Sequence, residues 1–134
     1  MACKILRIGV FFDGTDNSKE NISEYSNIAK LHEGYSIGEF EDEKGKITQV
    51  ESVYIVGLGH GEGEDAMSLA AGKYGAKKVY KAIDEVEDYL DIYTNNEDDE
   101  EPYKTRLIDV FGFSRGAAEA RDFVNTFAND SIII

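Results

Sequence analysis

Apolar residues gather in three short runs along the chain. The first run extends from Ile5 to Phe12 and is almost entirely apolar. The second, from Gln49 to Val56, and the third, from Arg106 to Phe111, are rich in β-branched and aromatic residues. Runs of this length and composition are typical of strands buried on both faces of a parallel sheet. We therefore predict three strands at these positions.

Elsewhere the apolar residues recur every three or four positions, which is the period of an amphipathic helix. This pattern predicts helices over Lys77 to Tyr93 and Ala117 to Ala128, with a short helix over Ser26 to Leu31. The region from Glu33 to Gly45 is rich in glycine and acidic residues, and we interpret it as a surface connection. Strands that alternate with helices predict an α/β fold with a parallel sheet. The length of 134 residues suits a single domain, residues 1–134.

Composition excludes several classes of function. A formal net charge of −13 argues against a nucleic-acid partner, because phosphates would be repelled and no Lys/Arg cluster offsets the charge. The acidic residues 95–101 are interpreted as a solvated loop. No apolar run approaches the roughly 18 residues of a membrane span, so we predict no transmembrane segment. The single cysteine, Cys3, excludes an internal disulfide and a cysteine-rich zinc site, and we expect synthesis in the cytoplasm.

Four glycines crowd residues 57–63, GLGHGEG, directly after the second predicted strand. A phosphate-binding loop would end in Gly-Lys-Ser/Thr, and a dinucleotide-binding loop would space its glycines differently. We therefore predict no nucleotide site and no cofactor. The scattered acids Asp13, Asp16 and Glu20 lack the spacing of a calcium-binding loop, so we assign no metal ligands.

The most informative motif is Gly112-Phe-Ser-Arg-Gly116, which matches G-x-S-x-G between a predicted strand and a predicted helix. A serine at such a strand-to-helix turn is a nucleophile candidate, because the sharp turn exposes its hydroxyl. Gly112 and Gly116 allow the neighbouring backbone to pass without Cβ collisions. The backbone N–H of Arg115, at the positive end of the helix, is a candidate donor to an oxyanion. The motif thus predicts a nucleophile elbow with Ser114 as its nucleophile.

Four further segments carry a resemblance to a known family. They are FFDGTDN (Phe11 to Asn17), SNIAKL (Ser26 to Leu31), VGLG (Val56 to Gly59) and DVFGFSRGAAEARDFVN (Asp109 to Asn125). In this order, and over most of the chain, they resemble the α/β-hydrolase family of type VI secretion phospholipase effectors. The resemblance implies a partial α/β-hydrolase-like fold and a serine esterase that acts on phospholipid acyl esters. It also implies a toxin that is injected into a neighbouring cell, with an immunity or secretion-apparatus protein as a possible partner.

The resemblance also suggests a role for the first loop. In α/β-hydrolases a loop beside the nucleophile strand supplies the second oxyanion donor, and Gly14 and Thr15 are the candidates here. Asp13 would then position this loop. The alternative is a phosphatase of the haloacid dehalogenase class, whose first strand also ends in an aspartate. That chemistry requires a second acid two residues later, where this chain has Thr15.

Asp109 lies within an otherwise apolar strand, where an unpaired carboxylate would cost several kcal/mol. We therefore expect it to have a cationic partner that helps to hold the elbow. Helical periodicity places Arg121 near the edge of the apolar face of the last helix. The sequence predicts that Asp109 pairs with Arg121 or Arg115, in a supporting rather than a catalytic role.

A catalytic base and acid are not evident. In α/β-hydrolases they follow the serine in the order acid, then histidine, but both histidines, His32 and His60, precede Ser114. Asp122 and Asp130 follow it without suiting the role of catalytic acid. We expect the chain to be the N-terminal portion of a larger hydrolase domain, inactive or nearly so by itself.

The segment Ser131-Ile-Ile-Ile134 reads as the start of another strand, so an open sheet edge and self-association are expected. The alternative to an enzyme is a non-catalytic remnant or interaction module that keeps the fold.

Overall fold

A computed structural model describes residues 4–14, 25–57, 75–94 and 103–130. Along the chain it contains β1 (Lys4–Phe12), α1 (Asn27–Gly34), β2 (Gly38–Glu41), β3 (Ile47–Ile55), α3 (Gly75–Thr94), β4 (Thr105–Gly112) and α4 (Arg115–Asp130). The three predicted strands and three predicted helices are all present, each longer than expected by at most a few residues. The glycine-rich residues 58–63 and the acidic residues 95–101 lie outside the described part of the chain.

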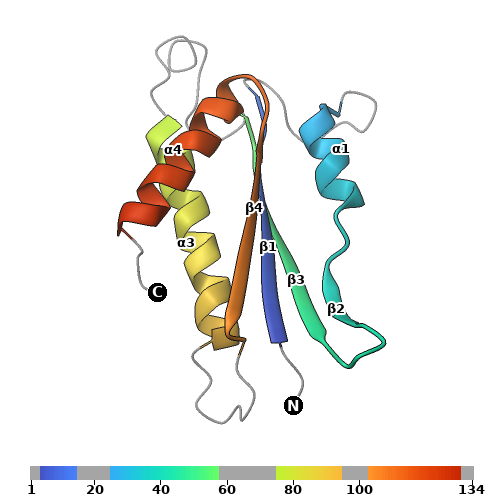
Figure 1. Cartoon of the computed structure of the whole chain (residues 1–134). Coiled ribbons are helices and arrows are strands. Elements are labelled where there is room, and N and C mark those ends of the chain that lie inside the picture. The colour runs from blue at the N-terminus through green and yellow to red at the C-terminus, as the bar shows by residue number, and fades with distance from the viewer. Residues whose placement is uncertain (1–3, 15–24, 58–74, 95–102, 131–134) are drawn as a thin grey trace.

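The described strands form one sheet in the order β2-β3-β1-β4. β1 pairs in parallel with β3 on one side and with β4 on the other, and β2 pairs antiparallel with β3 (Figure 1). The mixed α/β fold predicted from the sequence is confirmed, and it is consistent with a partial α/β-hydrolase-like fold. The prediction that residues 33–45 are only a surface connection is wrong, because they contain β2. With four residues and one apolar side chain, β2 is too short to produce a periodic signal.

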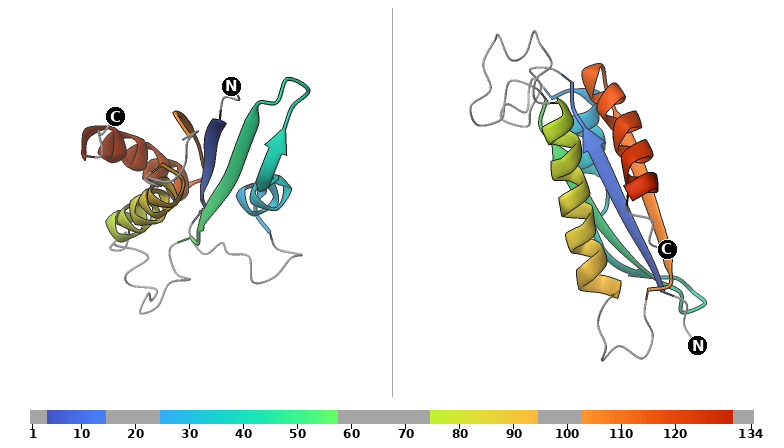
Figure 2. Two further views of the ribbon diagram at one scale, coloured as in Figure 1. Left: turned by 90° about the horizontal axis from the view of Figure 1, so that it is seen from below. Right: turned by 90° about the vertical axis from the view of Figure 1, so that its left-hand side faces the viewer.

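The main core lies between the sheet and the two long helices. Figures 1 and 2 show α3 and α4 side by side on one face of the sheet. Alternate residues of β1 point to this face and are fully buried. They pack with residues of β3, α3 and α4 into one cluster, whose members include Leu6, Ile8, Val10, Phe12, Val53, Ile55, Val79, Ala82, Val86, Ala120 and Phe123.

The opposite face of the sheet is covered by α1 and the segment that follows it. Phe11 of β1 stacks on Phe111 of β4, with 4.8 Å between the ring centroids. The rings of His32 and Tyr35 meet Phe11 edge-on. Tyr35 also lies across Gly9, where a Cβ atom would come within 2.6 Å of the tyrosine ring. β1 is therefore buried on both faces, as its nearly continuous apolar sequence predicts.

All three parallel strands end at the same edge of the sheet. β1 ends at Phe12, β3 at Ile55 and β4 at Gly112, and the helices α1, α3 and α4 begin at this end (Figure 1). In open α/β sheets the binding site lies outside the carboxyl ends of the strands. Among the described residues, no helix is both long and apolar enough to cross a membrane.

The packing of α4 gives a first testable prediction. Phe123 is 1% exposed and packs on Phe12, whereas its neighbour Val124 is 48% exposed. Phe123→Ala should lower the free energy of unfolding by about 3–5 kcal/mol, because it leaves a cavity in the core. Val124→Ala, the matched control, should change it by less than about 0.5 kcal/mol. Urea unfolding followed by circular dichroism measures both, and equal effects would contradict this packing of α4.

Candidate active site

Ser114 occupies the turn between β4 and α4. β4 ends at Gly112, α4 begins at Arg115, and the Ser114 side chain is exposed. Its backbone φ is +58°, and among the described residues other than glycine it is the only one with positive φ. Such a conformation is strained for a residue with a Cβ atom and persists only where the surrounding structure enforces it. The turn therefore projects this side chain at the carboxyl edge of the sheet.

The two glycines of the motif are required by close backbone contacts. A Cβ atom on Gly112 would come within 2.5 Å of the carbonyl oxygen of Gly116. A Cβ atom on Gly116 would come within 2.5 Å of the carbonyl oxygen of Asp13. No side chain fits at either position without moving the backbone. The start of α4 is thus pressed directly against the end of β1.

Backbone hydrogen bonds hold this turn in place. The N–H of Phe113 donates to the carbonyl of Phe12 (3.3 Å), which ties the turn to β1. The N–H groups of Gly116 and Ala117 donate back to the carbonyls of Phe113 and Ser114, both at 2.9 Å. The N–H of Arg115 belongs to the first turn of α4, at the positive end of the helix dipole. This end of α4 suits the stabilisation of negative charge beside Ser114.

Asp13, directly after β1, is a buried carboxylate with three hydrogen-bond donors. It is 1% exposed. Its Oδ1 accepts from the N–H of Gly14 (2.9 Å) and from the hydroxyl of Ser26 (2.7 Å), and its Oδ2 accepts from the hydroxyl of Tyr54 (2.5 Å). Ser26 is also the N-cap of α1, because its Oγ accepts from the N–H of Ala29. Asp13 therefore links the end of β1 to β3 and to the start of α1.

The neighbours of Asp13 indicate that it positions the chain. Burial and the hydrogen bond to Asp13 raise the pKa of the Tyr54 hydroxyl, which therefore stays protonated and donating. A carboxylate enclosed in this way is suited to positioning the chain, and its enclosure disfavours the phosphatase alternative, in which the aspartate must attack a substrate. Of the two loop residues predicted to donate to an oxyanion, Gly14 directs its N–H to Asp13, and Thr15 lies outside the described residues.

The predicted partner of Asp109 is wrong. Asp109 pairs with Arg7 of β1, whose Nε and Nη2 lie 2.6 and 3.2 Å from its two carboxylate oxygens. The hydroxyl of Tyr35 donates to the same carboxylate at 3.0 Å. The side chains on either side of Asp109, Ile108 and Val110, pack against the core beneath α3 and α4. Asp109 therefore points to the other face of the sheet, away from Arg121 and Arg115 of α4.

This ion pair shifts the pKa values of its members. The hydrogen bond from Arg7 lowers the pKa of the Asp109 carboxyl, against a smaller opposing effect of burial. The same hydrogen bond raises the pKa of Arg7. Burial, with the hydrogen bond to Asp109, raises the pKa of Tyr35 to about 12. The three side chains thus hold β1, β4 and the segment after α1 together in a fixed charge state at neutral pH.

Of the other candidates for acid and base, His32 and Asp122 have partners other than Ser114. His32 in α1 packs its ring on Phe11 and Tyr54, and its Nε2 lies 3.1 Å from the hydroxyl of Ser52. Asp122 is exposed on α4, where it accepts a hydrogen bond from Thr126. Asp130 is the last residue of α4, and His60 lies outside the described residues. The contacts of His32 are therefore those of a side chain that supports the fold, and they do not include Ser114.

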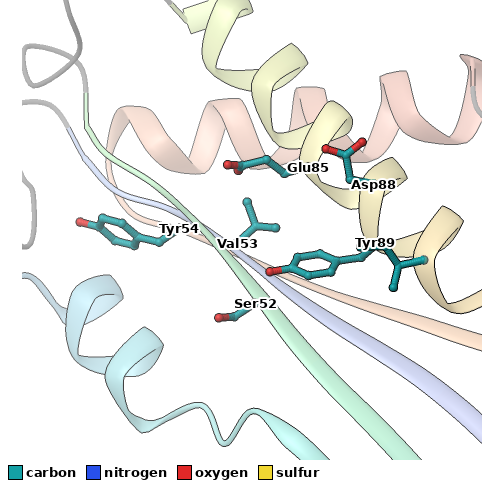
Figure 3. Close-up of a pocket in the computed structure, with 7 residues that line it drawn as sticks. Ser52, Val53, Tyr54, Glu85, Asp88 and Tyr89 are labelled. Atoms are coloured by element: carbon teal, nitrogen blue, oxygen red, sulfur yellow. The ribbon is translucent and has the colours of Figure 1, made fainter.

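A cavity of about 320 Å³ lies between β3 and α3 (Figure 3). Burial raises the pKa of the Glu85 carboxyl there. Ser114 does not line this cavity, and the Tyr54 hydroxyl is already bonded to Asp13. We therefore do not assign this cavity to the candidate active site. Its lining residues are Ser52, Val53, Tyr54, Glu85, Asp88, Tyr89 and Ile92.

Within the described ranges no three His, Cys, Asp or Glu side chains gather in a way that could hold a metal ion.

The close contact of Gly116 with β1 predicts a large effect of a single methyl group. Gly116→Ala should lower the free energy of unfolding by about 1–3 kcal/mol, because its Cβ has no room beside the carbonyls of Phe12 and Asp13. Gly34→Ala is the matched control, since no atom lies within 4 Å of the added Cβ there. Thermal unfolding compares the two variants. A Gly116→Ala variant as stable as Gly34→Ala would show that α4 does not approach β1 so closely.

The Arg7–Asp109 pair predicts a pH-dependent coupling. The pKa of Asp109 is lower in the folded protein than in the unfolded chain, where it is about 3.9. The contribution of the pair to the free energy of unfolding should therefore be complete at pH values well above the unfolded-state pKa, and it should be lost as the pH falls through the folded-state pKa. A double-mutant cycle with Arg7→Gln and Asp109→Asn should give a coupling free energy of about 0.5–1 kcal/mol at pH 7. The value is small because Arg7 is about half exposed and solvent screens the pair. A coupling free energy that is absent at pH 7, or unchanged at pH 3, would contradict this.

Comparison with known proteins gives one match. A profile of the family described as "T6SS, Phospholipase effector Tle1-like, catalytic domain", where T6SS is the type VI secretion system, matches residues 7–132. No curated protein and no solved structure matches the chain. The matched segment includes Asp13, the turn at Ser114 and the whole of the sheet except the first residues of β1. The chain belongs to the Tle1-like family of type VI secretion phospholipase effectors, within its catalytic domain.

Proposed function

We propose that this chain is part of a serine ester hydrolase that cleaves acyl-ester bonds of phospholipids, with Ser114 as its nucleophile. One observation carries the proposal. Ser114 is exposed with a φ of +58° at a strand-to-helix turn, between two glycines that close backbone contacts require. Membership of a phospholipase effector family supports the substrate class. The neighbouring Phe113, 47% exposed, offers an apolar surface to an acyl chain.

In the proposed reaction the Oγ of Ser114 attacks the carbonyl carbon of the ester, and a base takes the hydroxyl proton. The negative charge on the carbonyl oxygen is stabilised by the N–H of Arg115 and by the positive end of α4. The proton then passes to the leaving alcohol, and water releases the fatty acid from the acyl-enzyme. The loop that follows Asp13 is the proposed source of a second oxyanion donor, with Thr15 as the candidate, because the N–H of Gly14 already donates to Asp13.

Asp13 has a positioning role in this proposal. Its three hydrogen bonds fix the point at which the chain leaves β1, and the backbone at this point touches the start of α4. The loop after β1 therefore departs beside Ser114, as a second oxyanion donor requires.

The base and acid are proposed to come from residues beyond Ile134. No histidine follows Ser114 in the sequence, whereas α/β-hydrolases place both partners after the serine. The environment of His32, bonded to Ser52 and packed between two aromatic rings, supports this assignment. By its family, we further propose that the protein is delivered into neighbouring cells by type VI secretion and that an immunity protein restrains it.

One observation favours a second function, that of a non-catalytic interaction module. β4, which carries the Ser114 turn at its end, is one of the two edge strands among the described strands. Nucleophile strands more often lie within the sheet, and an open edge is a surface on which another chain can pair. Catalysis by Ser114 distinguishes the two functions.

Replacement of the proposed nucleophile provides the test. In the chain extended along its own reading frame past Ile134, Ser114→Ala should lower the hydrolysis of phospholipid vesicles by at least about 1,000-fold. Ser52→Ala, at a serine bonded to His32, is the matched control and should keep the activity. A fluorophosphonate should modify Ser114 alone. Hydrolysis that survives Ser114→Ala would refute the nucleophile, and an extended chain that neither hydrolyses lipid nor reacts with the probe would favour the interaction module.

A further inference from the structure

The cavity between β3 and α3 combines acidic side chains with aromatic and aliphatic ones. Its volume of about 320 Å³ lies at the lower end of the range for ligand pockets, so it suits a single side chain or a small organic ion. α3 contributes four side chains at intervals of three and four residues, which form one stripe along the helix: Glu85, Asp88, Tyr89 and Ile92. The ring of Tyr89 extends from α3 towards Val53 of β3 (Figure 3).

The cavity lies on the side of the sheet away from Ser114. In the sheet, β1 separates β3 from β4, which carries the Ser114 turn. Any strand that pairs with the outer side of β4 is therefore remote from the cavity. Asp88 and Ile92 are exposed, Ile92 to 63%, so the cavity is open to solvent. A group on the surface of another molecule can therefore enter it.

Both charged side chains of the lining are acidic, and among the described residues that line the cavity none is basic. Burial raises the pKa of the Glu85 carboxyl, and Lys81, one turn earlier on α3, offsets part of this effect. The charge of Asp88 raises the pKa of Glu85 as well. Glu85 is thus a partly desolvated carboxylate beside a second carboxylate. A cation in the cavity would stabilise both charges.

The remaining walls favour an organic cation. A cation over the face of a tyrosine ring is attracted to it, and Tyr89 offers such a ring. Burial, followed by the charges of Glu51 and Glu85, raises the pKa of Tyr89, so its phenol stays neutral at physiological pH. Val53 and Ile92 add aliphatic surface. Aromatic and aliphatic walls offer no ligands to a metal ion, which requires oxygen, nitrogen or sulfur donors.

A guanidinium suits this set of groups better than other organic cations do. It is planar and weakly hydrated, so it can stack on a tyrosine ring while its N–H groups donate to carboxylates. A phospholipid headgroup suits it less well, because the phosphate beside the ammonium would be repelled by Glu85 and Asp88. The net charge of −13 acts in the same direction, since it attracts basic partners and repels phosphates.

The charges of α3 are ordered against its dipole. The acidic residues of the helix all lie in its second half, whereas its basic residues lie in the first: Lys77, Lys78 and Lys81, then Asp84, Glu85, Glu87, Asp88 and Asp91. The carboxyl end of a helix is its negative end, so acidic residues there lower its stability. The stability of α3 therefore does not account for these residues. A cation bound beside them would recover part of the loss.

We propose that this cavity binds an arginine side chain of a basic protein partner. The guanidinium lies on the ring of Tyr89 and is held by the carboxylates of Glu85 and Asp88. Ile92, exposed at the rim, contacts the surface of the partner around that arginine. The other exposed acidic residues of α3 attract further basic residues of the same partner and speed the encounter.

Peptides that differ at one residue test the site on the full-length protein. Binding of acetyl-Gly-Arg-Gly-amide, followed by the NMR shift of the Ile92 methyl group at fixed ionic strength, should give a Kd of about 1 mM. The same peptide with citrulline, which has the shape of arginine without its charge, should bind at least about tenfold more weakly. The peptide with lysine should bind about threefold more weakly than the arginine peptide, because an ammonium is more strongly hydrated and does not stack.

Replacements in the lining test the contacts. Glu85→Gln and Tyr89→Leu should each weaken binding of the arginine peptide by about five- to tenfold. Glu87→Gln makes the same charge change on α3 at an exposed residue that does not line the cavity, so it is the matched control. It should alter the Kd by less than about twofold. Circular dichroism verifies that each variant is folded.

Four outcomes would overturn the proposal. The citrulline peptide could bind as tightly as the arginine peptide, or Glu87→Gln could weaken binding as much as Glu85→Gln. An Ile92 methyl group that does not shift at any concentration of peptide would show that the cavity does not accept arginine. Phosphocholine that binds more tightly than the arginine peptide would identify a lipid headgroup site instead. Ser114→Ala should bind the peptides like the wild type, so a failure of the proposed nucleophile has no bearing on this site.

Discussion

The close approach of α4 to the end of β1 is the contact on which the candidate site depends. Gly116 lies against the carbonyls of Phe12 and Asp13, and no larger residue fits there. The contact fixes where the helix begins relative to the sheet, which forces the left-handed backbone conformation of Ser114. The contact between β1 and α4 thus maintains the strained backbone of Ser114. It also leaves the Ser114 hydroxyl exposed at the carboxyl edge of the sheet.

Two carboxylates secure this arrangement by different means. Asp13 is fully buried and is satisfied by three neutral donors, a backbone N–H and two hydroxyls. Asp109 is partly exposed and is satisfied by a guanidinium and a tyrosine hydroxyl. Both lie on the face of the sheet covered by α1 or at its end, whereas the main apolar cluster lies beneath α3 and α4.

Much of the fold could be predicted because β1 and the long helices have strong apolar patterns. The motif around Ser114 also predicts a turn between a strand and a helix. The partner of Asp109 could not be predicted in this way. Helical periodicity indicates only that Arg121 leans towards the sheet, whereas the choice of Arg7 depends on which face of β4 carries Asp109 and on the pairing of β4 with β1. β2 was missed because its four residues carry a single apolar side chain. The partner of Asp109 and the pairing of β2 depend on which strands meet in the folded sheet. A local pattern of apolar and polar residues does not reveal that.

The central position of β1 has a consequence for biosynthesis. Its contacts with β4 join residues such as Arg7 and Asp109, which are 102 positions apart in the sequence. Long-range parallel pairing of this kind is formed late and slows folding. During translation β1 must therefore wait until the chain has been made as far as β4 before its second neighbour exists. An apolar nascent segment with this delay is a natural substrate for chaperones.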